Sequence, residues 1–179
     1  MVFSSAGKNS NVISDPYKLL DCAIHQKNDD EVVRLLNLVD EDDIPFLLFS
    51  AVVNRYTYAV ERLAPKSGTT QNNHSLGAAV SQKYIDGVKL LLPIADPRYN
   101  DSACLQRAVL NRDAEMFELL YPVSDAKVAL QGLKRCAQFK EQPDRKNESL
   151  FVELSNRVLR DTLHTQLACC GNERHKIKI

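Results

Sequence analysis

The residue types that metal binding needs gather near the C-terminus. They are His164, Cys169, Cys170 and His175. Zinc in structural sites takes four nitrogen or sulfur ligands. Adjacent cysteine side chains point apart, however, and rarely bind the same ion in a small site. We therefore predict no metal site and no cofactor.

Patterns typical of catalysis are also missing from the sequence. It contains no glycine-rich phosphate loop, no H-E-x-x-H motif and no C-x-x-C pair. The acidic runs at residues 29–30 and 41–43 fall in predicted turns between helices, where carboxylates are usually hydrated. A cysteine–histidine pair assembled by folding leaves no spacing to read. We predict no enzymatic activity, and an enzyme hidden in the fold is an alternative without a positive feature.

The elements that would position a binding site come from an internal repeat. Residues 51–65, 79–93 and 108–122 align without gaps, and residues 23–37 fit the same pattern. Each segment begins with an alanine, and a leucine lies three residues before it. These pairs are Leu20 and Ala23, Leu48 and Ala51, Leu76 and Ala79, and Leu105 and Ala108. The spacing of 28, 28 and then 29 residues predicts a solenoid of stacked units.

Each unit is predicted to be a pair of short antiparallel helices. The leucine and alanine define one buried face of the first helix, and the alanine is small where two helices approach closely. In the second helix an apolar residue and a leucine three positions later form another buried stripe. A basic residue follows each first helix, where a cation suits the helix dipole. The basic residues are Lys27, Arg55, Lys83 and Arg112.

This pattern resembles the ankyrin repeat, whose usual core reads T-P-L-H-x-A-A-x-x-G-H-x-E-V-V-x-L-L-L. The best match joins His-Ser-Leu-Gly-Ala-Ala at residues 74–79 with Val-Lys-Leu-Leu-Leu at residues 88–92. The resemblance covers residues 15–130, but the repeats are shorter than the usual 33 residues. It implies an all-α solenoid with reduced or absent hairpin fingers. The stretch at residues 91–97 is similar to divergent ankyrin arrays of bacteria, phages and large viruses.

The chain is expected to divide into three parts. Residues 1–14 are rich in Ser, Asn and Gly and are expected to be disordered. Residues 15–165 form the repeat domain, with a weaker fifth unit starting at Ala137 and a capping helix at its end. Residues 166–179 form a tail with cysteines and basic residues. On the capping helix three charged side chains are expected to face water: Arg157, Arg160 and Asp161.

Composition and charge narrow the class of function. The 179 residues are 44% hydrophobic and 26% charged, with a net charge of zero, which is ordinary for a globular protein. A nucleic-acid-binding protein would normally be more basic, so no nucleic-acid partner is expected. Five cysteines without framework spacing favour a reducing compartment. Three of them lie in apolar helical patterns, where thiols fill core space: Cys22, Cys104 and Cys136.

The resemblance implies a partner-binding groove along the first helices. In ankyrin repeats, positions shortly after the alanine point into this groove. In this sequence they are His25, Gln26, Val53, Asn54, Ser81, Gln82, Leu110, Asn111, Phe139 and Lys140. The set mixes amides, which both donate and accept hydrogen bonds, with apolar residues that suit the centre of an interface. Alternatively, Val53, Leu110 and Phe139 pack against a neighbouring repeat.

We therefore expect a protein-binding module that acts as an adaptor, inhibitor or effector on another protein. We expect it to work in the cytoplasm or, as an effector, after delivery into the cytosol of a host cell. The alternative is an interaction protein anchored to a membrane, with Cys169 and Cys170 acylated beside the basic tail. The partner protein and the oligomeric state are open at this point.

Overall fold

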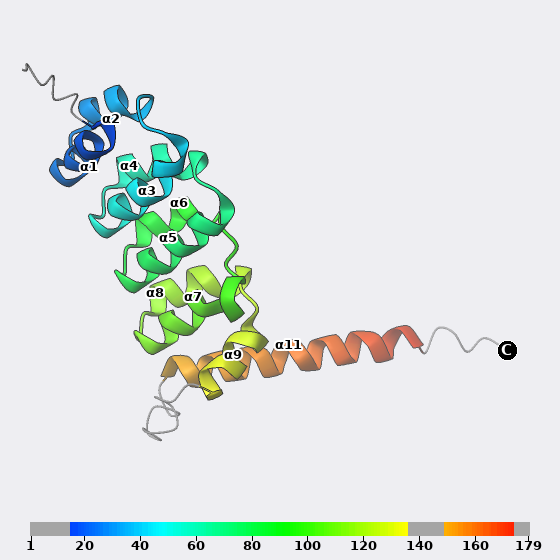
Figure 1. The fold of residues 1–179 in the computed structure, drawn as a ribbon. Helices are drawn as coiled ribbons and strands as arrows, with labels where there is room; N and C mark the ends of the chain where they lie inside the picture. The colour runs from blue at the N-terminus through cyan, green and yellow to red at the C-terminus, as the bar shows by residue number, and fades with distance from the viewer. Residues whose placement is uncertain (1–14, 136–148, 174–179) are drawn as a thin grey trace, which may run out of the picture.

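The computed structural model describes residues 15–135 and 149–173, with side chains up to residue 165 (Figure 1). These residues fold into helices and turns without a β-strand, which confirms the all-helical prediction. The first helices of successive pairs are α1 (Pro16–Gln26), α3 (Ile44–Val53), α5 (Thr69–Ser81), α7 (Tyr99–Leu110) and α9 (Ala126–Arg135). The second helices are α2 (Asp29–Leu36), α4 (Thr57–Leu63), α6 (Ile85–Leu91) and α8 (Ala114–Leu120). The last helix is α11 (Ser149–Glu173).

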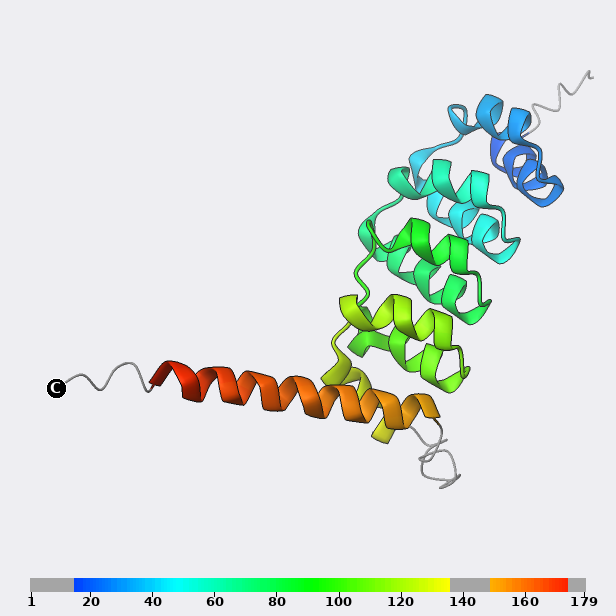
Figure 2. The same ribbon diagram turned by 180° about the vertical axis from the view of Figure 1, so that it is seen from behind.

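The helices pack as pairs, and the pairs follow one another in a stack (Figures 1 and 2). Each first helix contacts its own second helix and the first helix of the next pair, from α1 on α2 and α3 to α7 on α8 and α9. Among the second helices, α2 contacts α4 and α4 contacts α6. The first helices thus form one layer and the second helices the other.

The residues that recur in the sequence are the ones that hold the two layers together. The leucine and alanine of each of the first four units are buried, and so are the two apolar positions of each second helix. In the second helices these residues are Val32 and Leu35, Val60 and Leu63, Val88 and Leu91, and Phe117 and Leu120. Each unit alone would expose these stripes, so the stack is what removes them from water.

The turn between the two helices of a pair is the same in four successive units. The four basic residues all adopt a left-handed backbone, with φ between 50° and 54°. The next residue then donates its backbone N–H to the carbonyl of the repeated alanine, as Tyr84 does to Ala79 at 2.9 Å. This is the Schellman arrangement that ends a helix and satisfies its last carbonyls.

Side chains at these turns also connect one unit to the next. Arg55 donates to the backbone carbonyl of Gln82, and the Lys83 Nζ donates to the carbonyl of Asn111 at 3.3 Å. The basic residues therefore cap the following first helix as well as their own. In the opposite direction, the Tyr56 hydroxyl donates to the Asp29 carboxylate of the preceding unit.

A fifth unit follows the four units that share this turn. Its first helix is α9, which contacts α7, and its buried Leu133 lies 28 residues after Leu105. Ala137, predicted as the repeated alanine of this unit, lies outside the described residues.

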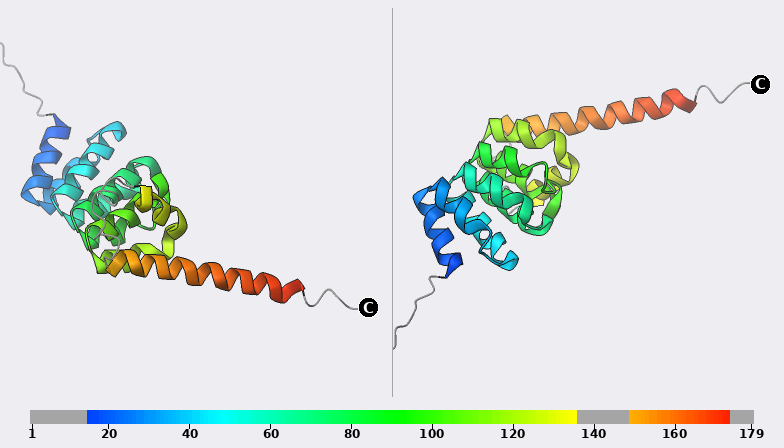
Figure 3. Two further views of the ribbon diagram at one scale, coloured as in Figure 1. Left: turned by 90° about the horizontal axis from the view of Figure 1, so that it is seen from below. Right: turned by 90° about the horizontal axis from the view of Figure 1, so that it is seen from above.

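Helix α11 lies across the end of the stack and projects well beyond it (Figure 3). It packs on α9 and buries Leu154 completely. The helix continues to Glu173, so residues 166–173, expected as part of a tail, extend it instead. Cys169 and Cys170 belong to this stretch, and their side chains lie outside the part that the structure describes.

Arg157 anchors α11 and does not face water as expected. Its guanidinium donates two hydrogen bonds to the Glu118 carboxylate, at 2.5 and 2.9 Å, and one to Glu153 at 2.7 Å. It also lies over the rings of Phe117 and Tyr121, at 5.2 and 4.9 Å from their centroids. Arg160 and Asp161 are exposed, as expected, and Asp161 also accepts a hydrogen bond from the Tyr121 hydroxyl at 2.8 Å.

Candidate partner-binding groove

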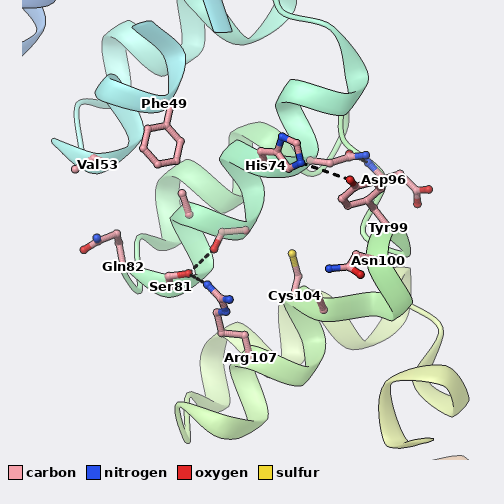
Figure 4. A pocket seen from close by; sticks show the side chains of 14 residues that line it. Phe49, Val53, His74, Ser81, Gln82, Asp96, Tyr99, Asn100, Cys104 and Arg107 are labelled. Carbon is pink, nitrogen blue, oxygen red and sulfur yellow. Dashed lines mark hydrogen bonds between the residues drawn. The ribbon is translucent and has the colours of Figure 1, made fainter. Parts of the chain in front are cut away.

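A groove with a volume of about 440 Å³ opens on the first-helix side of the stack, over α3, α5 and α7 (Figure 4). Helix α5 forms its floor, because α3 packs on one side of α5 and α7 on the other. The three helices belong to three different repeat units. The groove is thus a direct product of the stacking.

The wall from α3 is apolar. Phe46, Phe49 and Val53 follow one another at helical spacing and are 64%, 49% and 44% exposed. Phe49 and Val53 line the groove. An exposed stripe of large apolar residues is a feature of interaction surfaces.

The floor consists of small and polar residues of α5. Gly77, Ala78, Ser81 and Gln82 line it. The Ser81 hydroxyl donates to the carbonyl of Gly77 at 2.6 Å, which keeps the hydroxyl close to the helix. These mostly small side chains leave open space between the walls from α3 and α7.

The wall from α7 carries a neutral thiol and a positive charge. Cys104 is 9% exposed, and burial raises the pKa of its thiol to about 11, although nearby Arg107 opposes this shift. The thiol is protonated at neutral pH and is not a candidate nucleophile. Arg107 is exposed and donates to the Ser81 hydroxyl. No carboxylate among the residues that the structure describes forms an ion pair with it.

A pair of aromatic rings lines one end of the groove. His74 of α5 and Tyr99 of α7 meet edge to face, with their centroids 5.8 Å apart (Figure 4). Next to Tyr99, residues 100–102 all have a left-handed backbone, with φ from 52° to 57°. Such a run is costly for residues other than glycine. Asp96 is fixed beside it, because its backbone N–H donates to the Asn73 side chain at 2.7 Å.

The structure brings three of the ten predicted site residues into this groove: Val53, Ser81 and Gln82. His25 and Gln26 are exposed on α1 but do not line it. Phe139 and Lys140 lie outside the described residues.

The other three predicted residues are half-buried at helix ends. Asn54 is the C-terminal cap of α3, and its side chain donates to the Ser50 carbonyl at 2.8 Å. Asn111 is the cap of α7 and uses its carbonyl to bind Lys83. Leu110 packs against the core, as the alternative interpretation of this residue expects.

Phe49, Gly77 and Arg107 line the groove but were missed in the sequence. The resemblance pointed only to positions after the repeated alanine, and all three residues precede it in their units. A signal was present for Phe49, because Phe46, Phe49 and Val53 are spaced as one face of a helix. Arg107, directly before Ala108, carried no such signal.

Two further predictions concern cysteines and metal ligands. Cys104 is buried as expected, whereas Cys22 is exposed, so its placement in the core is wrong. The described residues contain no cluster of three or more side chains able to hold a metal ion. Over the same residues, none of the helices has the length and apolar character needed to cross a membrane.

We compared the chain with models of protein families, with curated proteins and with solved structures, and none of the three comparisons gave a match.

Proposed function

We propose that the chain is a protein-binding module built as an ankyrin-like solenoid, and that it binds its partner in the groove over α3, α5 and α7. Helix pairs with a common turn and a common pattern of burial support the solenoid. The proposal also agrees with the resemblance of residues 15–130 to ankyrin repeats.

The observation that carries the proposal is the exposed apolar wall of α3. Phe49 and Val53 expose about half of their surface in a groove that also offers amide, hydroxyl and guanidinium groups. Protein interfaces combine such an apolar centre with a polar rim. Because the first-helix layer is held by contacts between neighbouring units, it offers this surface with little ordering cost on binding.

Two matched valine substitutions test the proposal. Val53→Glu places a charge in the groove, and Val33→Glu makes the same change on α2, where the valine is exposed to a similar extent, 46% against 44%. Both variants should keep the thermal stability of the wild type, since surface changes usually cost little.

The wild type and the two variants would each be immobilised, and proteins that they retain from a cell lysate would be quantified by mass spectrometry. The proposal expects a protein that the wild type and Val33→Glu retain and that Val53→Glu loses. The interaction would then be repeated with the purified partner. If Val53→Glu binds this partner as tightly as the wild type does, the groove is the wrong surface.

A further inference from the structure

Gly77 has no structural reason to be glycine in the free protein. It lies inside α5 with a helical backbone, and a Cβ atom added there would have no atom of the described residues within 4 Å, apart from its own helix backbone and chain neighbours. Glycine is among the poorest helix formers, and alanine would suit this position better. The residue therefore weakens the helix without serving the packing of the chain.

The other glycines in the described residues differ from Gly77. At Gly68, Gly87 and Gly132 an added Cβ would lie less than 3 Å from a neighbouring side chain. At Gly87, for example, the ring of Tyr84 fills the space at 2.3 Å. At Gly77 the space belongs to the groove and is open. A glycine that faces an open groove is typical of a position where another backbone approaches closely.

Arg107 carries a positive charge that forms no ion pair with a carboxylate among the described residues. It is the one arginine or lysine that lines the groove in the part of the chain that the structure describes, and it donates a hydrogen bond to the neutral Ser81 hydroxyl. The groove also contains the Asp96 carboxylate, but this group accepts the backbone N–H of Arg98 at 3.0 Å. Arginine binds a carboxylate with two parallel hydrogen bonds, so an acidic group is its natural partner.

We propose that the groove binds a linear segment of a partner protein whose main chain crosses α5 at Gly77, with an acidic side chain on Arg107 and an apolar side chain against Phe49 and Val53. The inference rests on the proposed function and adds the chemistry of the partner. The acidic and apolar positions lie on opposite sides of the crossing point, because Arg107 comes from α7 and Phe49 from α3 (Figure 4).

The probe for this inference is a phage library of random linear peptides, selected on the full-length chain. Selected peptides should share an aspartate or glutamate close to an aromatic or aliphatic residue. The most enriched peptide would be synthesised with a fluorescent label, together with a version in which lysine replaces its acidic residue. Dissociation constants would be measured by fluorescence polarisation.

Gly77→Ala should separate stability from binding. The variant should melt about 2 °C higher than the wild type, because alanine stabilises the helix. It should bind the acidic peptide at least about fivefold more weakly, because the added methyl group occupies the crossing point. A glycine kept only for folding would not produce this opposite pair of changes.

Arg107→Glu should reverse the charge preference. It should bind the acidic peptide about tenfold or more weakly and prefer the lysine version. Lys89→Glu is the matched control, because Lys89 is exposed on α6, which belongs to the layer of second helices and does not line the groove. This control should bind the acidic peptide like the wild type.

Each contrary result has a distinct meaning. If Gly77→Ala and Arg107→Glu both bind like the wild type while Val53→Glu does not, the inference is wrong and the groove remains the binding surface. If Val53→Glu binds normally as well, the proposed function fails with it. A library that yields no enriched acidic peptide overturns the inference. A wild-type dimer that Val53→Glu converts to a monomer would also overturn the inference, because the groove would then be occupied by a second copy of this chain.

Discussion

Replacing a repeated alanine with leucine should destabilise the stack from its centre. Ala79 and Ala108 are completely buried, each in a first helix that contacts both neighbouring first helices. Each alanine also accepts a backbone hydrogen bond from the N-cap residue directly before the next helix, at 2.9 Å for Ala79 and 3.0 Å for Ala108. The backbone is therefore fixed where a larger side chain would need it to move.

The expected cost of either Ala→Leu change is about 1–3 kcal/mol, the usual range for adding atoms to a filled core. For a chain of this size, each 1 kcal/mol lowers the melting temperature by about 2–4 °C, so the shift should be about 2–12 °C. A leucine that fitted without strain would instead gain about 2 kcal/mol from burial. The sign of the change thus tells whether the space around the alanine is filled.

The assay is urea denaturation followed by far-UV circular dichroism on the full chain. Ala114→Leu is the control, because Ala114 is exposed at the first position of α8 and the change is chemically the same. This variant should stay within about 0.5 kcal/mol of the wild type. If the two buried variants match the control within error, the close helix contact inferred from the repeated alanine does not exist.

Three other predictions concern hydrogen exchange in α11, the reactivity of two cysteines and the stability of the fold at alkaline pH. Arg157→Met should speed backbone hydrogen exchange in α11, while Arg160→Met, with a single hydrogen bond to Glu153 at 3.5 Å, should leave it unchanged; equal exchange in both variants would contradict the anchoring role. Iodoacetamide followed by mass spectrometry should modify Cys22 well before Cys104, since the latter thiol is buried with a raised pKa. Alkaline titration should reveal a loss of stability above pH 9. Burial raises the pKa of Cys104 from 9.0 to about 11 and that of Tyr121 from 10.0 to about 12. The folded state thus holds these protons more tightly, and this stabilisation is complete below the unfolded values and disappears as the pH rises to about 12; melting temperatures that stay constant from pH 8 to pH 11 would contradict it.

The sequence predicted the local features of the fold because they depend on neighbouring residues. Leucine and alanine three positions apart mark a buried helix face whatever lies opposite, and Leu76 and Ala79 are indeed buried. The basic residues were correctly placed at the ends of the first helices. Their second contact was not predicted, because Arg55 reaches a carbonyl in the next unit, which only stacking brings near.

The lining of the groove was predicted only in part for the same reason. Val53, Ser81 and Gln82 line the groove and follow the repeated alanine, where the resemblance placed the site. Arg107 and Gly77 gain their significance from what surrounds them. Whether Arg107 faces a carboxylate, and whether the space beside Gly77 is filled, depends on the side chains that neighbouring units contribute to the groove.

The sequence by itself determined the helical class, the length of the repeat and the residues of its buried faces. A helix repeats every 3.6 residues, so the residues of its buried face recur in the sequence at three- and four-residue spacing. Tertiary structure decided the anchoring of α11 by Arg157 and the composition of the groove. These features join residues about one repeat or more apart in the chain. Their contacts depend on the angle and distance at which neighbouring helices pack, and no local pattern records those quantities.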